Sequence, residues 1–379
     1  MVELAFAAGT HVLAIGPFPP AVTGAAKNTA IVCADVEARG AQVSRLQTNK
    51  TRARTEHVRT IGLYAEKTLG FLANMGRIAS PRLAHATGTT VYLVPDGGQG
   101  VVFSAAYARM ASARFPRLVV HHRNYSHIHS RSRLMMELVR AAPDTTLHVF
   151  LDPVMEERFK AIYSADLHSA YVPNAATCDV ISSEAASAAA EHATVSVGFL
   201  SNLVEDKGFD VVVESFVELA KRLGPRVRFL LAGRPIGSAN TARLEALRRE
   251  LGVQLDYRGE VFGDAKTAFF QECDIFVFPT RYSQEAQPNV LYEAMAGGSL
   301  IVSTHWAGVP WVVEDTISRL VAPTAEGADD LVAAVEDIIS TEDLRTARTS
   351  QVEAFRAKKA DADTRYERLL AHLLGAAEF

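Results

Sequence analysis

Short runs of apolar residues recur along the chain, and longer stretches with apolar residues at helical spacing separate them. Such runs are typical of strands that are buried on both faces of a sheet. The predicted strands are His11–Gly16, Gln42–Gln47, Thr90–Val94, Leu118–His122, Thr146–Leu151, Ala170–Pro173, Thr194–Leu200, Arg226–Ala232, Leu255–Val261, Ile275–Phe278, Leu300–Val302 and Arg319–Val321. Because helical stretches lie between most of them, the sequence predicts an α/β protein with doubly wound parallel sheets.

One interval between predicted strands differs in composition. Residues 176–193 are rich in Ala, Ser and Thr, so we interpret them as a linker. We predict a Rossmann-like N-terminal domain over residues 1–175, a Rossmann-like C-terminal domain over residues 194–355, and a last helix over residues 356–379. A length of 379 residues fits two domains better than a single core.

The stretch from Phe276 to Gly298 is predicted to form a strand, a loop and a helix. Pro279 ends the strand, and Asn289–Ala296 are mostly good helix formers that two glycines follow. This order places a helix N-terminus just beyond the carboxyl end of a buried strand, where α/β proteins bind ligands.

The first amides of this predicted helix, those of Asn289, Val290 and Leu291, have no partner within the helix and lie at its positive end. A diphosphate binds well in such a place. Glu285 precedes the helix and Glu293 lies within it, and carboxylates accept hydrogen bonds from hydroxyl groups. We interpret the stretch as a sugar-nucleotide site, with Glu285 near the sugar and Glu293 near the ribose. The alternative is an amphipathic helix with two solvated glutamates.

The spacing Glu285-x7-Glu293, followed by Ala-Met-Ala-Gly-Gly, resembles the donor-site signature of retaining glycosyltransferases with two Rossmann domains. These GT-B enzymes are the family 4-like glycosyltransferases, which include relatives of glycogen synthase and of phosphatidylinositol mannosyltransferase. The resemblance implies two domains that face across a cleft and a last helix that crosses back to the N-terminal domain.

A second motif carries the same resemblance. Residues 201–208 are similar to the family's Gly-Arg-Leu-x3-Lys-Gly loop. Lys207 matches the lysine that binds the donor diphosphate, whereas Asn202 stands in place of the arginine. Two alternatives are open for the missing cation: Arg281 or Arg234, the nearest arginines in terms of the motifs, supplies the charge, or the helix amides suffice.

Three further donor contacts follow from the resemblance. Gly24 lies in the first loop, where glycine lets backbone approach the donor phosphate; the alternative is a plain turn. Arg258 and Val261 lie where the family's backbone meets the nucleobase.

The segment from His121 to His129 has the most unusual composition of the chain and follows a predicted strand end. Related enzymes place a histidine near the donor sugar, so we assign that role to His122, with Tyr125 and His129 as further candidates. Two alternatives are open: a metal site built from the histidines at 121, 122, 127 and 129, and a polar loop that caps the next helix.

The formal net charge of −4 is unevenly distributed. Residues 1–180 hold 19 Lys and Arg against 13 Asp and Glu, whereas residues 181–379 hold 20 against 30. One interpretation is that the first half faces something anionic, such as a membrane surface or a phosphorylated acceptor. The alternative is a fluctuation in surface charge without a function. A basic loop at Lys50–Arg59 and a helix with a Lys/Arg face over Leu63–Ile78 fit peripheral membrane contact, but the helix's apolar side fits a buried core as well.

Several classes of protein are disfavoured. Three widely spaced cysteines argue against a disulfide framework, and we expect neither a signal peptide nor a transmembrane helix. GxGxxG and Walker patterns are absent, which argues against nicotinamide dehydrogenases and P-loop NTPases. The Asp361-x-Asp363 pair follows no strand, so we interpret it as solvated surface. The expected location is the cytoplasm, with peripheral contact at the inner membrane face as an option, and no nucleic-acid partner is expected.

The sequence therefore predicts a retaining glycosyltransferase that moves a sugar from a UDP- or GDP-linked donor to a glycan, lipid-linked or small-molecule acceptor. The resemblance implies that no bound metal or cofactor is needed. One alternative is a nucleotide-sugar epimerase of the same fold. Another is a non-catalytic protein that binds sugar nucleotides or glycans, which the missing arginine at Asn202 favours.

Overall fold

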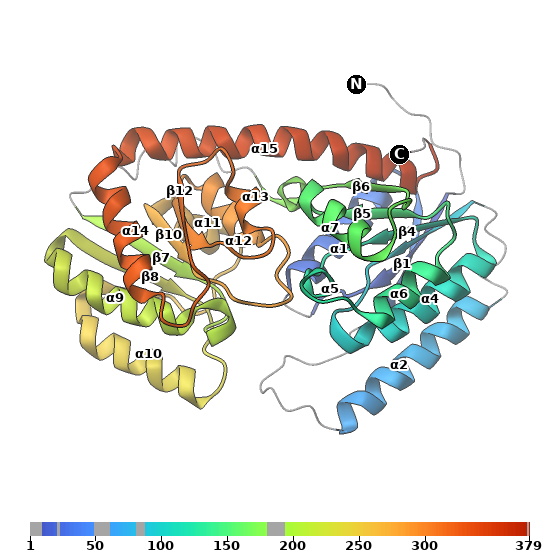
Figure 1. Cartoon of the computed structure of the whole chain (residues 1–379), viewed down its shortest axis with the longest axis horizontal. Helices are drawn as coiled ribbons and strands as arrows, with labels where there is room; N and C mark the ends of the chain where they lie inside the picture. Colours follow the sequence, from blue (N-terminus) through green and yellow to red (C-terminus); the bar gives the residue numbers. More distant parts are fainter. Residues whose placement is uncertain (1–9, 21–22, 49–60, 81–87, 180–193, 377–378) are drawn as a thin grey trace. The chain divides into compact units, whose positions relative to one another are not determined.

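The computed structural model describes residues 10–20, 23–48, 61–80, 88–179, 194–376 and 379 (Figure 1). The predicted basic loop at Lys50–Arg59 and most of the predicted linker lie outside these residues. Contacts within the chain define two compact units. Unit 1 comprises Met1–Thr177 with Asp361–Phe379, and unit 2 comprises Cys178–Ala360.

Unit 1 contains a parallel six-stranded sheet with the strand order β2-β1-β3-β4-β5-β6. Its strands are β1 (His11–Gly16), β2 (Gln42–Gln47), β3 (Thr89–Leu93), β4 (Arg117–His121), β5 (Leu147–Phe150) and β6 (Ser169–Tyr171). Its helices are α1 (Gly24–Ala38), α2 (Ile61–Ala79), α4 (Val101–Arg114), α5 (Ser126–His129), α6 (Arg133–Ala141) and α7 (Pro153–Tyr163), with short 3-10 turns η1 (Gly98–Gly100) and η2 (Asn174–Thr177). All six residues of β1 are buried, as its apolar run predicts.

Unit 2 contains a second parallel six-stranded sheet with the order β12-β11-β10-β7-β8-β9. Its strands are β7 (Val195–Leu200), β8 (Val227–Ala232), β9 (Leu255–Tyr257), β10 (Ile275–Phe278), β11 (Leu300–Thr304) and β12 (Ser318–Val321). Its helices are α9 (Phe209–Leu223), α10 (Ser238–Leu251), α11 (Gly263–Glu272), α12 (Asn289–Ala296), α13 (Val309–Val313) and α14 (Ala328–Thr341), with 3-10 turns η4 (Glu205–Lys207), η5 (Gly224–Arg226) and η6 (Gly252–Gln254). Two parallel Rossmann-like sheets confirm the predicted fold class.

The last helix, α15 (Leu344–Leu373, red in Figure 1), contributes to both units. In unit 1, its Leu369, Leu370 and Leu373 join the hydrophobic core that lies against the sheet. Tyr366 Oη donates to Asp35 Oδ2 of α1 at 2.7 Å. The prediction that the last helix returns to the N-terminal domain is confirmed, although the helix begins before residue 356.

Strand β9 is shorter than predicted, because it ends at Tyr257 and not at Val261. Gly259 has a φ of +66°, which turns the chain out of the strand. Its carbonyl accepts a hydrogen bond from Gly233 N at 2.6 Å. Residues 258–261 therefore form a loop at the carboxyl end of the sheet.

Two further sequence predictions concern the environment of the chain. No helix among the described residues is both long and apolar enough to span a bilayer. All three cysteines lie in the described part of the chain, where each is free and buried.

Candidate functional site

The loop between β10 and α12 lies at the carboxyl edge of the sheet of unit 2, and neighbouring loops hold it on both sides. On one side, Trp306 Nε1 donates to the carbonyl of Tyr282 at 2.9 Å. Gly308 N donates to the carbonyl of Ala286 at 3.1 Å. On the other side, Arg281 N donates to Asp206 O at 2.8 Å, which ties the loop to the segment that follows β7.

The N-terminus of α12 supplies the expected amides only in part. Pro288 is the N-cap residue, and Leu291 N donates to its carbonyl at 3.1 Å. The prediction that the Leu291 amide is open to a ligand is therefore wrong, because a 3-10-type bond already uses it. The amides of Asn289 and Val290 lie in the first turn, at the positive end of the helix.

Lys207 and Glu285, which are 78 residues apart in the sequence, form an ion pair through Lys207 Nζ and Glu285 Oε2. The side chains are 20% and 12% exposed, so the pair is accessible but largely shielded from water. Lys207 Nζ also lies 4.5 Å from the centroid of the Tyr282 ring, a distance at which a cation is attracted to the ring face. The structure thus brings together the two residues that the sequence assigns to the diphosphate and the sugar.

Gly208 explains why a glycine follows Lys207. Its φ is +81°, in the left-handed region. A Cβ at this position would lie 2.2 Å from the carbonyl oxygen of Pro279, at the end of β10. The close approach of the two backbones places Lys207 beside the loop that carries Glu285.

Glu293 forms a second lysine–glutamate pair, which no pattern in the sequence predicts. Lys266 Nζ of α11 lies 2.5 Å from Glu293 Oε2, and the two side chains are 27% and 13% exposed. Nothing in the spacing of the sequence connects these two residues. A ribose held by Glu293 would share this carboxylate with Lys266.

The two arginines considered as replacements for the missing one differ in their contacts. Arg281 is engaged within unit 2: its Nη2 donates to Asp210 Oδ2 at 2.8 Å and to Glu205 O at 3.1 Å. Arg234 is half-buried, and its Nε is a buried atom without a hydrogen-bond partner in the described structure. Asn202 is exposed and lies in the loop between β7 and η4.

The residues expected near the nucleobase lie at the same edge of the sheet. Arg258 pairs with Asp256 Oδ2 at 2.7 Å and with Glu272 Oε2 at 2.5 Å, so two carboxylates neutralise its charge. Val261 is half-buried in the loop that follows. Their contact with a base stays a prediction.

In unit 1, His122 lies in a buried aromatic cluster. It is 3% exposed, its Nε2 lies 2.9 Å from His148 Nδ1 in a hydrogen bond, and its ring stacks on Phe150. Burial holds the pKa of His122 well below the ordinary value, and the nearby His148 lowers it further. The ring is thus neutral and engaged within the core, and its contact with a donor sugar stays a prediction.

Of the other candidates of unit 1, Tyr125 and His129 lie together, with ring centroids 5.1 Å apart. Tyr125 is buried, with its hydroxyl 3.2 Å from Arg158 Nη1, whereas His129 is exposed. Gly24 is the exposed first residue of α1. His121 Nδ1 lies 2.8 Å from Tyr92 Oη. Within the described residues, no three His, Cys, Asp or Glu side chains gather as a metal would require, so the histidines of this segment do not converge.

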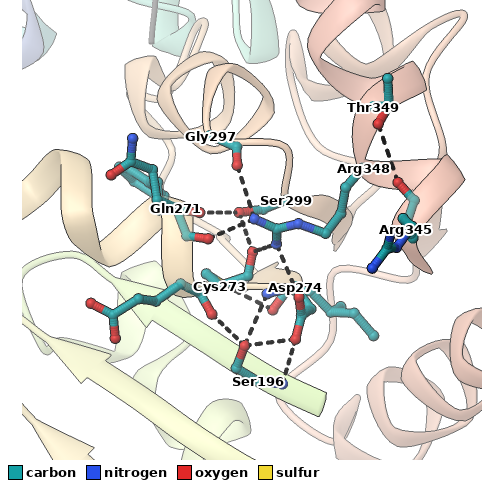
Figure 2. A network of polar contacts seen from close by, with 12 residues as sticks. Ser196, Gln271, Cys273, Asp274, Gly297, Ser299, Arg345, Arg348 and Thr349 are labelled. Atoms are coloured by element: carbon teal, nitrogen blue, oxygen red, sulfur yellow. Dashed lines mark hydrogen bonds and ion pairs between the residues drawn. The ribbon is translucent and has the colours of Figure 1, made fainter. Parts of the chain in front are cut away.

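A buried arginine, which no pattern in the sequence predicts, fixes the C-terminal end of α12 (Figure 2). Arg348 of α15 donates to the carbonyls of Cys273, Gln271 (2.6 Å) and Gly297 (3.2 Å) and to Asp274 Oδ1 (3.1 Å). Asp274 is held in turn by Ser196 of β7, whose N and Oγ donate to its Oδ2 at 2.9 and 2.8 Å. The guanidinium thereby joins the C-terminus of α12 to the turn before β10.

Comparison with known proteins finds a family match within unit 2. Residues 194–341 match the family of glycosyl transferases group 1. A 147-residue stretch, 39% of this chain and 40% of the relative, is 29% identical to a lipopolysaccharide core biosynthesis glycosyltransferase, LpsE, of Rhizobium meliloti. A 148-residue stretch, 38% of this chain, is 32% identical to 31% of a phosphatidylinositol N-acetylglucosaminyltransferase component from Arabidopsis thaliana. The matched part thus spans less than half the length of either relative.

Solved structures share the fold of the chain. Sucrose-phosphate synthase from Thermosynechococcus elongatus matches with a TM-score of 0.71 and 16% identity over 97% of this chain and 100% of that one. HepE of Anabaena in complex with UDP-glucose matches with a TM-score of 0.64 and 14% identity over 96% and 99%. Residues 194–341 therefore match the glycosyl transferases group 1 family, and the chain has the two-Rossmann-domain (GT-B) fold that its sequence motifs predict.

Proposed function

We propose that the chain is a retaining glycosyltransferase that takes a sugar from a UDP- or GDP-linked donor. The observation that carries this proposal is the Lys207–Glu285 pair beside the start of α12. A cation, a carboxylate and helix amides at one sheet edge match the three chemical parts of a sugar diphosphate: its anionic bridge, its hydroxyl groups and its leaving phosphate.

In the proposed reaction, the bond between the sugar's anomeric carbon and the phosphate oxygen breaks, and its electron pair stays on the phosphate. The acceptor hydroxyl bonds to the same face of the anomeric carbon and gives its proton to the leaving phosphate. Lys207 and the amides of Asn289 and Val290 stabilise the charge that develops there, because they are already in position. Glu285 orients the sugar and exchanges its pairing with Lys207 for a hydroxyl group, while Glu293 holds the ribose.

The acceptor is proposed to be a glycan, a lipid-linked sugar or a small molecule. The relatives named for lipopolysaccharide core and phosphatidylinositol chemistry support a lipid-linked acceptor. Peripheral contact with an anionic membrane through unit 1 would bring the enzyme to such an acceptor.

The test measures acceptor-dependent release of UDP or GDP by wild type, Lys207→Ala and Glu285→Ala. Each variant should lose about 10²-fold or more in kcat/KM, the scale of one lost transition-state contact. Two variants serve as matched controls. Glu205→Ala removes an exposed carboxylate from the turn that carries Lys207, and Lys221→Ala removes an exposed lysine of α9; both should retain activity. Treatment with EDTA should leave turnover intact.

Normal turnover in Lys207→Ala or Glu285→Ala would contradict the assigned site. Loss of turnover in EDTA that Mn²⁺ restores would contradict the metal-free reaction. Interconversion of two sugar nucleotides without an acceptor would favour the epimerase instead, and nucleotide binding without any product would favour the non-catalytic protein.

A further inference from the structure

The strands β7 and β8 keep one register beyond their ends. Val195 pairs with Val227 and Leu200 with Ala232, and the isolated bridge between Leu203 and Pro235 has the same offset. The intervening position in this register sets Asn202 opposite Arg234.

Hydrogen bonds fix this juxtaposition on both sides. Leu203 N donates to Arg234 O at 2.9 Å, and Ile236 N donates to Leu203 O at 3.3 Å. Gly233 lets the two segments approach, since a Cβ at this residue would lie 1.6 Å from the carbonyl oxygen of Ser201. Opposed residues of neighbouring parallel strands project on the same side, about 5 Å apart. Arg234 therefore leaves the backbone beside the position at which the family's loop carries its arginine.

The charge of Arg234 is uncompensated in the described structure. No carboxylate pairs with it there, and its Nε is buried without a hydrogen-bond partner. Arg281 differs, because Asp210 and two backbone carbonyls already use its guanidinium. Of the two arginines, only Arg234 has donors available for an anion.

We propose that Arg234 supplies the second cation for the donor diphosphate and so replaces the arginine that is absent at position 202. This inference rests on the proposed function of the same site. A guanidinium can bind two phosphate oxygens at once through its paired N–H groups, which a lysine cannot do. Lys207 from the β7 loop and Arg234 from the β8 loop would then hold the diphosphate together.

The experiment compares the affinity of purified full-length chain for UDP and GDP with its affinity for uridine and guanosine, measured by calorimetry. Arg234→Ala and Arg234→Gln should weaken binding of the preferred diphosphate by roughly 10- to 100-fold, the scale of a lost charged hydrogen bond, and leave binding of its nucleoside unchanged. The double variant Asn202→Arg/Arg234→Ala should recover most of the lost diphosphate affinity, because it supplies a guanidinium from the opposed position in the β7 loop.

Arg228→Ala is the matched control. Arg228 lies near the amino end of β8, the strand that precedes Arg234, whereas Arg234 follows its carboxyl end. Arg228 is also half-buried and also has an Nε without a partner in the described structure. Its removal should leave diphosphate affinity unchanged, which separates a ligand contact from a general effect of removing a half-buried arginine.

Diphosphate affinity within twofold of wild type in both Arg234 variants would overturn the inference while the proposed function stands. An equal loss for diphosphate and nucleoside, or for Arg228→Ala, would also overturn it, since that pattern indicates a structural role. If wild type binds neither UDP nor GDP, the proposed function itself fails.

Discussion

Replacing Arg348 by Ala should destabilise unit 2 more than any surface substitution in the same helix. Arg348 is 1% exposed, and its guanidinium donates to three carbonyls and to one carboxylate (Figure 2). Alanine would leave the Asp274 carboxylate without its cation and would remove one donor from each of three carbonyls, of which that of Cys273 keeps a bond from Ser299 Oγ. Removing one partner of a buried ion pair typically costs about 3–5 kcal/mol.

The expected size of this effect can be expressed as a shift of the unfolding midpoint. For a unit of this length, 1 kcal/mol corresponds to about 2–4 °C, so the midpoint of unit 2 should fall by roughly 6–20 °C. The C-terminus of α12 would lose its anchor at the same time, and the first turn that faces the proposed diphosphate would be less well fixed. A loss of nucleotide affinity should accompany the loss of stability.

Intrinsic fluorescence isolates the relevant unit, because the chain has two tryptophans and both Trp306 and Trp311 lie in unit 2. Trp306 is also bonded to the loop that carries Glu285. Thermal unfolding followed by tryptophan emission therefore reports on unit 2 without a contribution from unit 1.

Arg345→Ala is the control, since Arg345 is exposed and lies one turn earlier in α15. The control should unfold within about 0.5 kcal/mol of wild type, as surface substitutions usually do. If Arg348→Ala unfolds within about 1 kcal/mol of Arg345→Ala, the buried arginine does not stabilise this unit and the reasoning is refuted.

Two other substitutions test single features of the units. Gly208→Ala would force a Cβ to within 2.2 Å of Pro279 O at a φ of +81°, so we expect lower stability and a loss of turnover as Lys207 moves; unchanged kinetics would contradict the role of the close approach. Burial, with the nearby charge of His168, lowers the pKa of His148 to about 4. Between pH 6.5 and about 4, His148 is therefore protonated in the unfolded chain but neutral in the folded one. The stability of unit 1 should fall as pH drops through this range, at up to about 1.4 kcal/mol per pH unit for this histidine. His148→Gln should reduce that slope in unfolding curves followed by circular dichroism, and an unchanged slope would contradict the assignment.

Local patterns in the sequence were sufficient for the elements that build the site. The predicted bounds of β10 and α12 are those of the structure, because an apolar run, a proline and a glycine pair mark them within a few residues. Lys207 and Glu285 could be assigned to one ligand only through the family's motifs, and the structure places their charged groups in contact.

Contacts between distant charged residues could not be predicted in this way. Arg348 lies in a charged helix whose sequence looks solvated, and only the fold shows that it points into the core. Lys266 is likewise unremarkable until α11 brings it to Glu293. His122 follows a strand end, as predicted, but His148 and Phe159 of neighbouring elements enclose its ring. Each of these outcomes depends on which elements pack together, which the spacing along one segment does not contain.

A crystal structure of the chain with a bound UDP- or GDP-sugar tests the central claim most directly. We predict that the diphosphate lies within hydrogen-bonding distance of Lys207 Nζ and of the first-turn amides of α12, with Glu285 on the sugar and Glu293 on the ribose. A donor bound elsewhere, with the Lys207–Glu285 pair intact and no phosphate at the start of α12, would contradict the account.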